Sequence, residues 1–245
     1  MKRAPYVADS AALDVTIICP VAGAAPFLAK TVKSVIAQSF AEWQLILIAN
    51  GTERDLPMVA KLDSRIRVIV EVRPGAAAAR NAGLRCVTTA AFAFLDADDV
   101  WHPDKLALQC AFLRRSPAHG AVYNAFDLID ETDRRVGPGW APASITFRGL
   151  CRAEGMIPGM NNLMVRSSLL ERLGAMNEQL RLGEDIDYLF RLAQLAPLGF
   201  IDKVLSHYRL HPDNTTKDYW AAYRGVVSLA RIVREAEAAP GFGAA

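Results

Sequence analysis

Cysteine is scarce in this sequence of 245 residues, and its spacing argues against two kinds of structural site. The four cysteines are Cys19, Cys86, Cys110 and Cys151, and no two of them form a C-x-x-C pair. Zinc sites and the disulfide frameworks of small secreted domains both need closely patterned cysteines. We therefore expect reduced thiols that are buried in the core.

The sequence also lacks a strong net charge and a long apolar run. The 28 Lys and Arg residues nearly balance the 26 Asp and Glu residues, and the formal charge of +2 argues against a nucleic-acid partner. A membrane-spanning helix needs about 18 consecutive apolar residues, and no such run occurs. The N-terminal segment MKRAPY lacks the apolar stretch of a signal peptide. We expect a cytoplasmic protein without a membrane span.

Short apolar segments alternate with helix-like segments in the first half of the chain. The segment DVTIIC at 14–19 is rich in β-branched residues and is followed by Pro20, which is typical of a strand and its end. The expected strands are 14–19, 43–49, 66–72 and 91–95, and the expected helices are 26–38, 56–62 and 74–87. This alternation predicts a parallel sheet with helices on both faces, as in Rossmann-like nucleotide-binding units.

The second half of the chain has a less regular pattern. Ser168 and Glu171 have the spacing of a capping box, so we expect a helix to begin there. Other helices are expected at 104–114, around 186–193 and at 220–234, strands at 120–129, 161–165 and 200–210, and a loop or hairpin at 134–142. Because no repeat or flexible linker interrupts the sequence, we expect a single α/β domain.

Three carboxylates follow the fourth expected strand directly. Ligands of open parallel sheets bind beyond the carboxyl ends of the strands, and Asp96, Asp98 and Asp99 stand at such an end. Like charges this close repel one another, and each carboxylate loses hydration. A divalent cation such as Mg²⁺ or Mn²⁺ would remove that conflict. The alternative is that Asp98 or Asp99 caps a helix that begins near Pro103.

Six segments together carry a resemblance to a known family. They are VTIICPV at 15–21, NGT at 50–52, AARNAG at 78–83, FLDADDVW at 94–101, LGEDIDY at 182–188 and YRLH at 208–211. In this order they resemble glycosyltransferase family 2, from about residue 14 to residue 216. The resemblance implies a GT-A fold and the transfer of a sugar from a nucleotide-diphosphate sugar to an acceptor hydroxyl.

The resemblance also implies a division of the chain. Residues 14–235 would form the glycosyltransferase domain, with a nucleotide-binding half at 14–100 and an acceptor-binding half at 101–235. Residues 1–13 would form an N-terminal extension, and residues 236–245 a frayed tail.

Roles for the donor site follow from the family motif, residue by residue. The first aspartate of the family's D-x-D motif lies near the donor ribose and the last holds the metal, which implies these roles for Asp96 and Asp98. Arg80 would contact the donor nucleotide, and a surface ion pair is the alternative. His211 would reach the metal or the diphosphate, although a lone histidine in a polar loop is more often a surface residue. The implied nucleotide-sugar site consists of Pro20, Val21, Asn50, Arg80, Asp96 and Asp98.

The Glu184–Asp185 pair supplies the expected base. The family resemblance implies that Asp185 is the general base and that Glu184 contacts the acceptor. Both residues open an amphipathic helix and therefore lie near the positive end of its dipole. An aspartate of ordinary pKa is ionised at neutral pH and available as a base. The alternative is that Glu184, Asp185 and Asp187 only cap the helix.

Two departures from the family pattern concern the donor. Ala22, Gly23 and Ala24 stand where the family usually has an aromatic residue, Asn and often an acidic residue. Asn50 stands where an aspartate commonly recognises the base, and an amide can both donate and accept hydrogen bonds. A UDP-sugar remains the expected donor. Because the sequence offers no second carboxylate as a nucleophile, we expect single displacement with inversion.

Two other functions remain as alternatives. A nucleotidyltransferase of sugar phosphates would usually have a glycine-rich, basic loop after the first strand, and the segment 20–25 has no basic residue. A non-catalytic sugar-nucleotide-binding protein is the second alternative. The expected acceptor is a glycan or a lipid-linked sugar. Because the helix at 220–234 carries three arginines, we expect at most transient contact with the inner face of the membrane.

Overall fold

The computed structural model describes residues 13–51, 56–139, 141, 143–151, 159–180 and 182–214. In the first half, strands and helices alternate as expected, and each lies within three residues of its expected limits. The strands are β1 (Val15–Val21), β2 (Trp43–Ala49), β3 (Ile66–Val70) and β4 (Ala91–Phe94). The helices are α1 (Leu28–Ile36), α2 (Leu56–Ala60) and α3 (Ala76–Leu84).

The second half departs from the expected pattern in several places. The expected strand at 161–165 is a 3₁₀ turn, η1 (Met160–Asn162), followed by β8 (Met164–Arg166). The helix expected to begin at Ser168 is present, and its first turn is a 3₁₀ turn. This turn, η2 (Ser167–Leu169), leads directly into α6 (Leu170–Leu173). Two short elements were not expected, β5 (Val100–Trp101) and α5 (Phe147–Cys151).

The remaining elements agree with the sequence. They are α4 (Lys105–Arg115), β6 (Ala121–Ile129), β7 (Arg135–Pro138), α7 (Glu184–Leu195) and β9 (Leu198–Arg209). The expected helix at 220–234 and the expected tail at 236–245 lie outside the described residues. None of the helices in the described ranges is long and apolar enough to cross a membrane.

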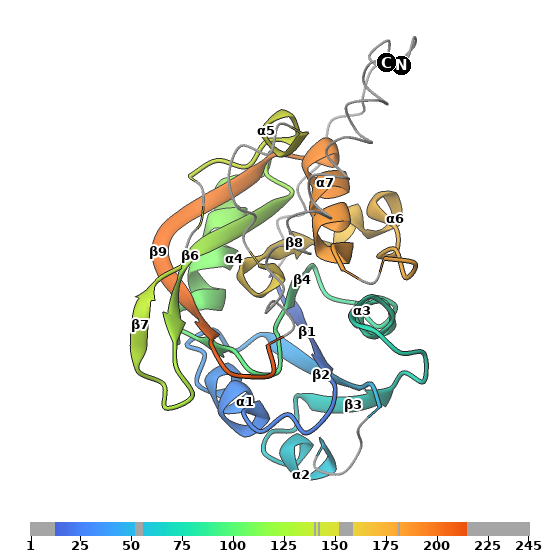
Figure 1. Ribbon diagram of the computed structural model, residues 1–245. Coiled ribbons are helices and arrows are strands. Elements are labelled where there is room, and N and C mark those ends of the chain that lie inside the picture. Colours follow the sequence, from blue (N-terminus) through green and yellow to red (C-terminus); the bar gives the residue numbers. More distant parts are fainter. Residues whose placement is uncertain are drawn as a thin grey trace.

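One sheet joins both halves of the described chain (Figure 1). Its strand order is β3-β2-β1-β4-β8-β6-β9-β5, and β7 pairs with β6. The strands β3, β2, β1 and β4 are all parallel, whereas β8 runs antiparallel to both β4 and β6. The carboxyl ends of the first four strands therefore share one edge, where the sequence predicts the site.

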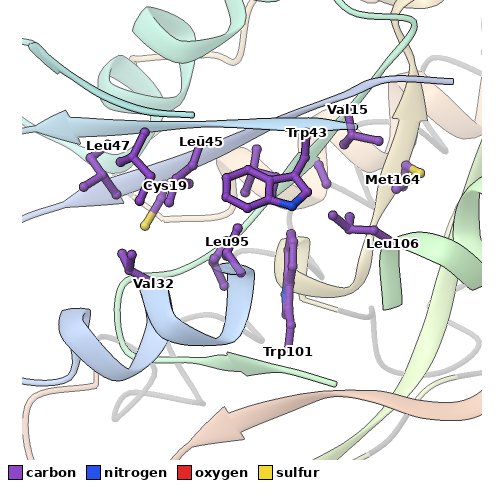
Figure 2. Packing of buried hydrophobic residues seen from close by; sticks show 14 of the residues in the cluster. Val15, Cys19, Val32, Trp43, Leu45, Leu47, Leu95, Trp101, Leu106 and Met164 are labelled. Carbon is purple, nitrogen blue, oxygen red and sulfur yellow. The ribbon is translucent and has the colours of Figure 1, made fainter. Parts of the chain in front are cut away.

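Two apolar layers cover the faces of the sheet. One contains buried residues of α1 and α4, and the other those of α3, α6 and α7. Figure 2 shows the first layer, which contains the side chains of Trp43 and Trp101. Leu13, the first described residue, is buried in the same layer. Cys19 and Cys110 are buried free thiols as expected, whereas Cys86 is half-buried.

A glycine sets the height of α3 above the sheet. A Cβ atom at Gly83 would lie 2.4 Å from Ile18 Cγ2, closer than packed side chains approach one another. The missing side chain therefore lets α3 lie directly on β1. This close approach brings Arg80, one turn earlier in α3, to the carboxyl edge of the sheet.

Candidate active site

The pairing of β5 with β9 brings two distant segments together. The strands are antiparallel, with Val100 opposite His207 and Trp101 opposite Ser206. The residues that precede β5 therefore face those that end β9. As a result, His211 Nε2 lies 2.9 Å from Asp98 Oδ2. The two residues expected to serve a metal are thus neighbours, although β5 itself was not expected.

Asp99 anchors this loop from inside. It is fully buried, accepts a hydrogen bond from Asn161 Nδ2 at 2.7 Å, and accepts another from the Arg209 backbone N–H at 2.9 Å. Helix α4 has Asp104 as its N-cap residue, so Asp98 and Asp99 do not cap it. The capping alternative is therefore wrong.

Arg209 holds the same loop from the other side. Its guanidinium is fully buried, and Nε donates to the carbonyl of Asp98 at 2.8 Å while Nη1 donates to the carbonyl of Asp130 at 2.8 Å. Its Nη2 lies 2.6 Å from Asp133 Oδ1, and the guanidinium stacks on the ring of Phe27. The backbone around Asp98 is therefore fixed by groups that are themselves buried.

Arg80 links the two halves of the site. Its Nη2 lies 2.9 Å from Asp96 Oδ1 and its Nη1 lies 2.9 Å from Glu184 Oε1. Only 9% of its side chain is exposed, so the alternative of a surface ion pair is wrong. Burial lowers the pKa of Arg80, but the neighbouring carboxylates raise it by more, so the net shift is upward. The guanidinium is therefore a permanent cation.

The first turn of α7 carries the expected base. Burial is the main cause that raises the pKa of Glu184, the charge of Asp185 adds to it, and Arg80 opposes it. Asp185 is half-buried, and one of its oxygens, Oδ1, accepts a hydrogen bond from the N–H of Ile186 at 2.8 Å. Asp187 instead pairs with Arg191 along the helix, at 2.7 Å. Within the described ranges Asp185 Oδ2 makes no hydrogen bond, so this oxygen could contact a ligand.

The donor set around Asp98 fits a divalent cation that is shared with a phosphate ligand. Burial raises the pKa of Asp98, the charge of Asp96 raises it further, and the hydrogen bond from His211 opposes both. A cation would relieve this penalty on the charged form. Among the described residues, no three His, Cys, Asp or Glu side chains form a ready-made metal cluster. Mg²⁺ commonly binds through one or two carboxylates together with substrate phosphates, and Asp98 suits that mode.

His211 fits the metal role less directly. Its Nδ1 accepts a hydrogen bond from the Asp213 backbone N–H at 3.2 Å. In the neutral ring the other nitrogen, Nε2, then carries the proton and donates it to Asp98. Binding a metal through Nε2 would require a change of tautomer. In the described arrangement His211 is a hydrogen-bond donor to Asp98.

Asn50 uses its side chain to hold the loop between β3 and α3. Its Nδ2 donates to the carbonyls of Glu71 and Arg73 at 2.9 and 2.7 Å, and its Oδ1 accepts from the N–H of Gly75 at 3.1 Å. Both amide hydrogens are therefore engaged by the backbone. The expected donor residues Pro20 and Val21 lie beside it, because the N–H of Asn50 donates to the carbonyl of Val21.

A comparison with known families identifies the chain. The sequence profile of glycosyl transferase family 2 matches residues 16–173. The chain belongs to this family.

Several curated bacterial glycosyltransferases are similar to this chain. TuaG of Bacillus subtilis, a putative teichuronic acid biosynthesis glycosyltransferase, is 29% identical over 85% of this chain and 83% of its own length. WfgD of Escherichia coli is 30% identical over 58% of this chain and 56% of its own length. It is named as a UDP-Glc:alpha-D-GlcNAc-diphosphoundecaprenol beta-1,3-glucosyltransferase. An uncharacterized glycosyltransferase of Rickettsia prowazekii is 24% identical over 82% of this chain and 65% of its own length.

Solved structures of TarS from S. aureus share the fold. TarS residues 1–349 in complex with UDP-GlcNAc match with a TM-score of 0.68 at 16% identity, over 88% of this chain and 66% of that one. The full TarS structure matches over 39% of its length. The GT-A type architecture expected from the sequence is thereby confirmed. The chain spans less than two thirds of several of the proteins that it matches.

Several residues that build this family 2 site are absent from the site residues expected from the sequence. Asp99 was one of three carboxylates within four residues, and Arg209 stood two positions before His211, so both had a visible signal. Asn161 and Glu178 had none, because their partners lie far away in the sequence. Asn81 stands directly after Arg80 in the motif, which could have marked it.

Proposed function

We propose that this chain transfers a sugar from a nucleotide-diphosphate sugar to an acceptor hydroxyl. The observation that carries the proposal is Arg80, a buried cation that contacts Asp96 of the loop after β4 and Glu184 of α7 at the same time. One cation thus joins the expected donor loop to the helix that carries the expected base. Membership of glycosyl transferase family 2 supports the same conclusion.

The donor would lie at the carboxyl edge of β1, β2 and β4. Asp96 faces the ribose, Arg80 neutralises negative charge beside it, and Pro20, Val21 and Asn50 shape the base end. Asp98 would hold a divalent metal, Mg²⁺ or Mn²⁺. Such a metal, when bound, stabilises negative charge on the departing diphosphate.

Asp185 acts as the general base in this proposal. Its carboxylate takes the proton of the acceptor hydroxyl while the hydroxyl oxygen bonds to the anomeric carbon. The bond from that carbon to the diphosphate oxygen breaks, and the nucleoside diphosphate leaves with the electron pair. Attack opposite the leaving group inverts the anomeric centre. Glu184, held by Arg80, contacts the acceptor next to the base.

The names of the similar proteins support the substrate classes. TarS was crystallised with UDP-GlcNAc and with UDP, which supports a UDP-sugar as the donor. WfgD is named for a diphosphoundecaprenol-linked acceptor, and TuaG for teichuronic acid biosynthesis. We therefore propose a glycan or lipid-linked acceptor and a site of action in the cytoplasm, with at most transient contact with the inner face of the membrane.

A screen of donors tests the function. UDP-, GDP- and dTDP-sugars are incubated with the protein and Mn²⁺, with water or simple glycosides as acceptors, and release of the nucleoside diphosphate is measured. We expect turnover with at least one donor, and turnover with Asp185→Asn that is slower by about 10²-fold or more. Formation of a nucleotide sugar from a sugar phosphate and a nucleoside triphosphate would instead identify a nucleotidyltransferase.

A further inference from the structure

The segment that leads into α7 has no regular secondary structure of its own. Residues 174–180 and 182–183 connect α6 to the Glu184–Asp185 pair without a helix or strand. The backbone groups of such a segment lack the partners that a helix or strand supplies, so they bond to side chains of neighbouring elements. The position of the proposed base therefore depends on what holds these residues.

Asn81 holds the start of this segment. It is buried, and its side chain exchanges two hydrogen bonds with the backbone of Met176, donating to the carbonyl at 3.0 Å and accepting from the N–H at 2.7 Å. Its Nδ2 also lies 2.8 Å from Glu178 Oε1. Asn81 follows Arg80 in α3, so one helix contacts the active site with one residue and supports the segment with the next.

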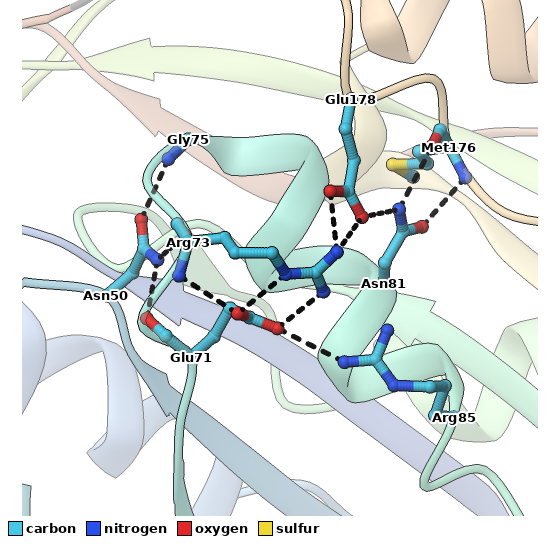
Figure 3. A network of polar contacts seen from close by, with 8 residues as sticks. All are labelled: Asn50, Glu71, Arg73, Gly75, Asn81, Arg85, Met176 and Glu178. Carbon is cyan, nitrogen blue, oxygen red and sulfur yellow. Dashed lines mark hydrogen bonds and ion pairs between the residues drawn. The ribbon is translucent and has the colours of Figure 1, made fainter.

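Glu178 joins the segment to the loop between β3 and α3 as well (Figure 3). Arg73 Nη1 donates to both of its carboxylate oxygens, at 2.7 and 3.0 Å. Arg73 in turn donates hydrogen bonds to Glu71. The buried carboxylate of Glu71 also accepts a hydrogen bond from Arg85 Nη2. The backbone of Arg73 and that of Glu71 are bound in turn by Asn50.

We propose that Glu178 is a positioning residue for the general base. Bound to Asn81 and Arg73, it clamps the segment before α7 onto α3 and the β3–α3 loop, and thereby sets where Asp185 meets the acceptor. The inference rests on the proposed sugar transfer and adds a residue to it. Because Glu178 and Glu184 line one pocket of about 330 Å³ with the first turn of α3, the clamp also shapes the surface next to the base.

The contribution of this clamp is to catalysis more than to stability. The side chains of Arg73 and Glu178 are 48% and 33% exposed, and ion pairs this accessible to water add little to folding. A shift of about 1 Å in a catalytic group can cost roughly 10²-fold in rate. Glu178→Ala should therefore fold normally and still turn over slowly.

The test is a double-mutant cycle of Glu178→Ala with Asp185→Asn. In the wild-type background, Glu178→Ala should lower kcat by about tenfold or more and leave the Kd for UDP with Mn²⁺ within about twofold. In the Asp185→Asn background it should lower kcat no further, because the base through which it acts is already absent. Glu178→Gln should recover most of the rate, since its amide oxygen still accepts from Asn81 and Arg73. Glu171→Ala, at an exposed carboxylate of α6, is the matched control and should match the wild type.

Several outcomes would overturn the inference. An unchanged kcat in Glu178→Ala removes the positioning role, and a weaker Kd for UDP with an unchanged kcat moves Glu178 to the donor site. An equal loss in both backgrounds shows that it acts apart from Asp185. If the wild type turns over no donor, the proposed function fails and this inference with it. If the wild type turns over and the Glu178 variant equals it, the positioning role alone fails.

Discussion

Asp98 and His211 are 113 positions apart in the sequence, and their side chains meet at 2.9 Å. The contact exists because β5 and β9 pair antiparallel directly beside it. Two buried residues, Arg209 and Asp99, join the same two segments: the Arg209 N–H donates to Asp99 Oδ1, and Arg209 Nε donates to the carbonyl of Asp98. The proposed metal site is therefore formed by tertiary pairing, and a change at either strand should affect it.

The first prediction concerns metal-dependent donor binding. Asp98→Ala should remove the tightening of UDP binding that Mn²⁺ causes, because Asp98 is the carboxylate best placed to hold the cation. Loss of several kcal/mol of charge stabilisation should lower turnover by about 10²-fold or more. Calorimetric titration of UDP with and without Mn²⁺ measures the effect. Asp202→Ala, at an exposed position of β9, is the control, and equal metal dependence in both variants would refute the assignment.

The second prediction concerns the base. Asp185→Asn is nearly isosteric, so the affinity for UDP and Mn²⁺ should stay unchanged while kcat falls by about 10²-fold or more. Steady-state kinetics and calorimetry on the same preparation separate the two effects. If the variant loses affinity for UDP and keeps its rate, Asp185 is part of the donor site and the proposed mechanism is wrong.

The third prediction concerns Asn50. Because its amide holds three backbone groups, Asn50→Ala should loosen the β3–α3 loop and cost roughly 2 kcal/mol of stability. Affinity for UDP and GDP should then fall by the same factor, so that their ratio stays as in the wild type. Denaturant unfolding and competition binding measure these two quantities. A selective loss of one nucleotide would show that Asn50 reads the base.

The sequence was informative about the fold where local pattern and tertiary environment agree. β2 has the limits expected from its run of apolar residues, because a strand buried on both faces needs such a run. The 3₁₀ turn at Met160–Asn162 was missed because the side chain of Asn161 bonds to two distant residues, Trp101 and Asp99, which no local pattern reveals. β5 was missed because two residues carry too little pattern to mark a strand.

The residues of the site also fall into those that a local motif reveals and those that it does not. Asp96, Asp98, Arg80 and Glu184 were expected from motif segments, and the structure brings them together at one edge of the sheet. The motif segments mark the positions of Arg209 and Asn81 but not what these residues bind, because each contacts backbone groups of a segment far away in the chain. A motif marks residues that touch ligands more clearly than it marks residues that hold those residues in place.

The last prediction concerns a buried lysine behind the site. Lys105 is fully buried, with Nζ 2.7 Å from Gln109 Oε1 and 4.4 Å from the centre of the Trp101 ring. Burial lowers its pKa from 10.5 to about 7. Between about pH 7 and pH 10 the unfolded chain therefore binds a proton that the folded chain does not, so the free energy of unfolding should rise with pH there, by at most about 1.4 kcal/mol per pH unit. Below that window both states are protonated, and this contribution to the slope vanishes.

Lys105→Met removes the titrating group while keeping a long side chain, so it should flatten this rise. Urea unfolding of both proteins at pH 6, 7, 8 and 9 measures the difference in slope, which cancels the titration of other groups. The Lys→Met change also leaves Gln109 without its donor, so the absolute stability at one pH is not diagnostic and the slope is. Lys203→Met, at an exposed position of β9, should keep the wild-type slope. A slope in Lys105→Met equal to that of the wild type would mean that Lys105 stays protonated in the folded protein throughout this range.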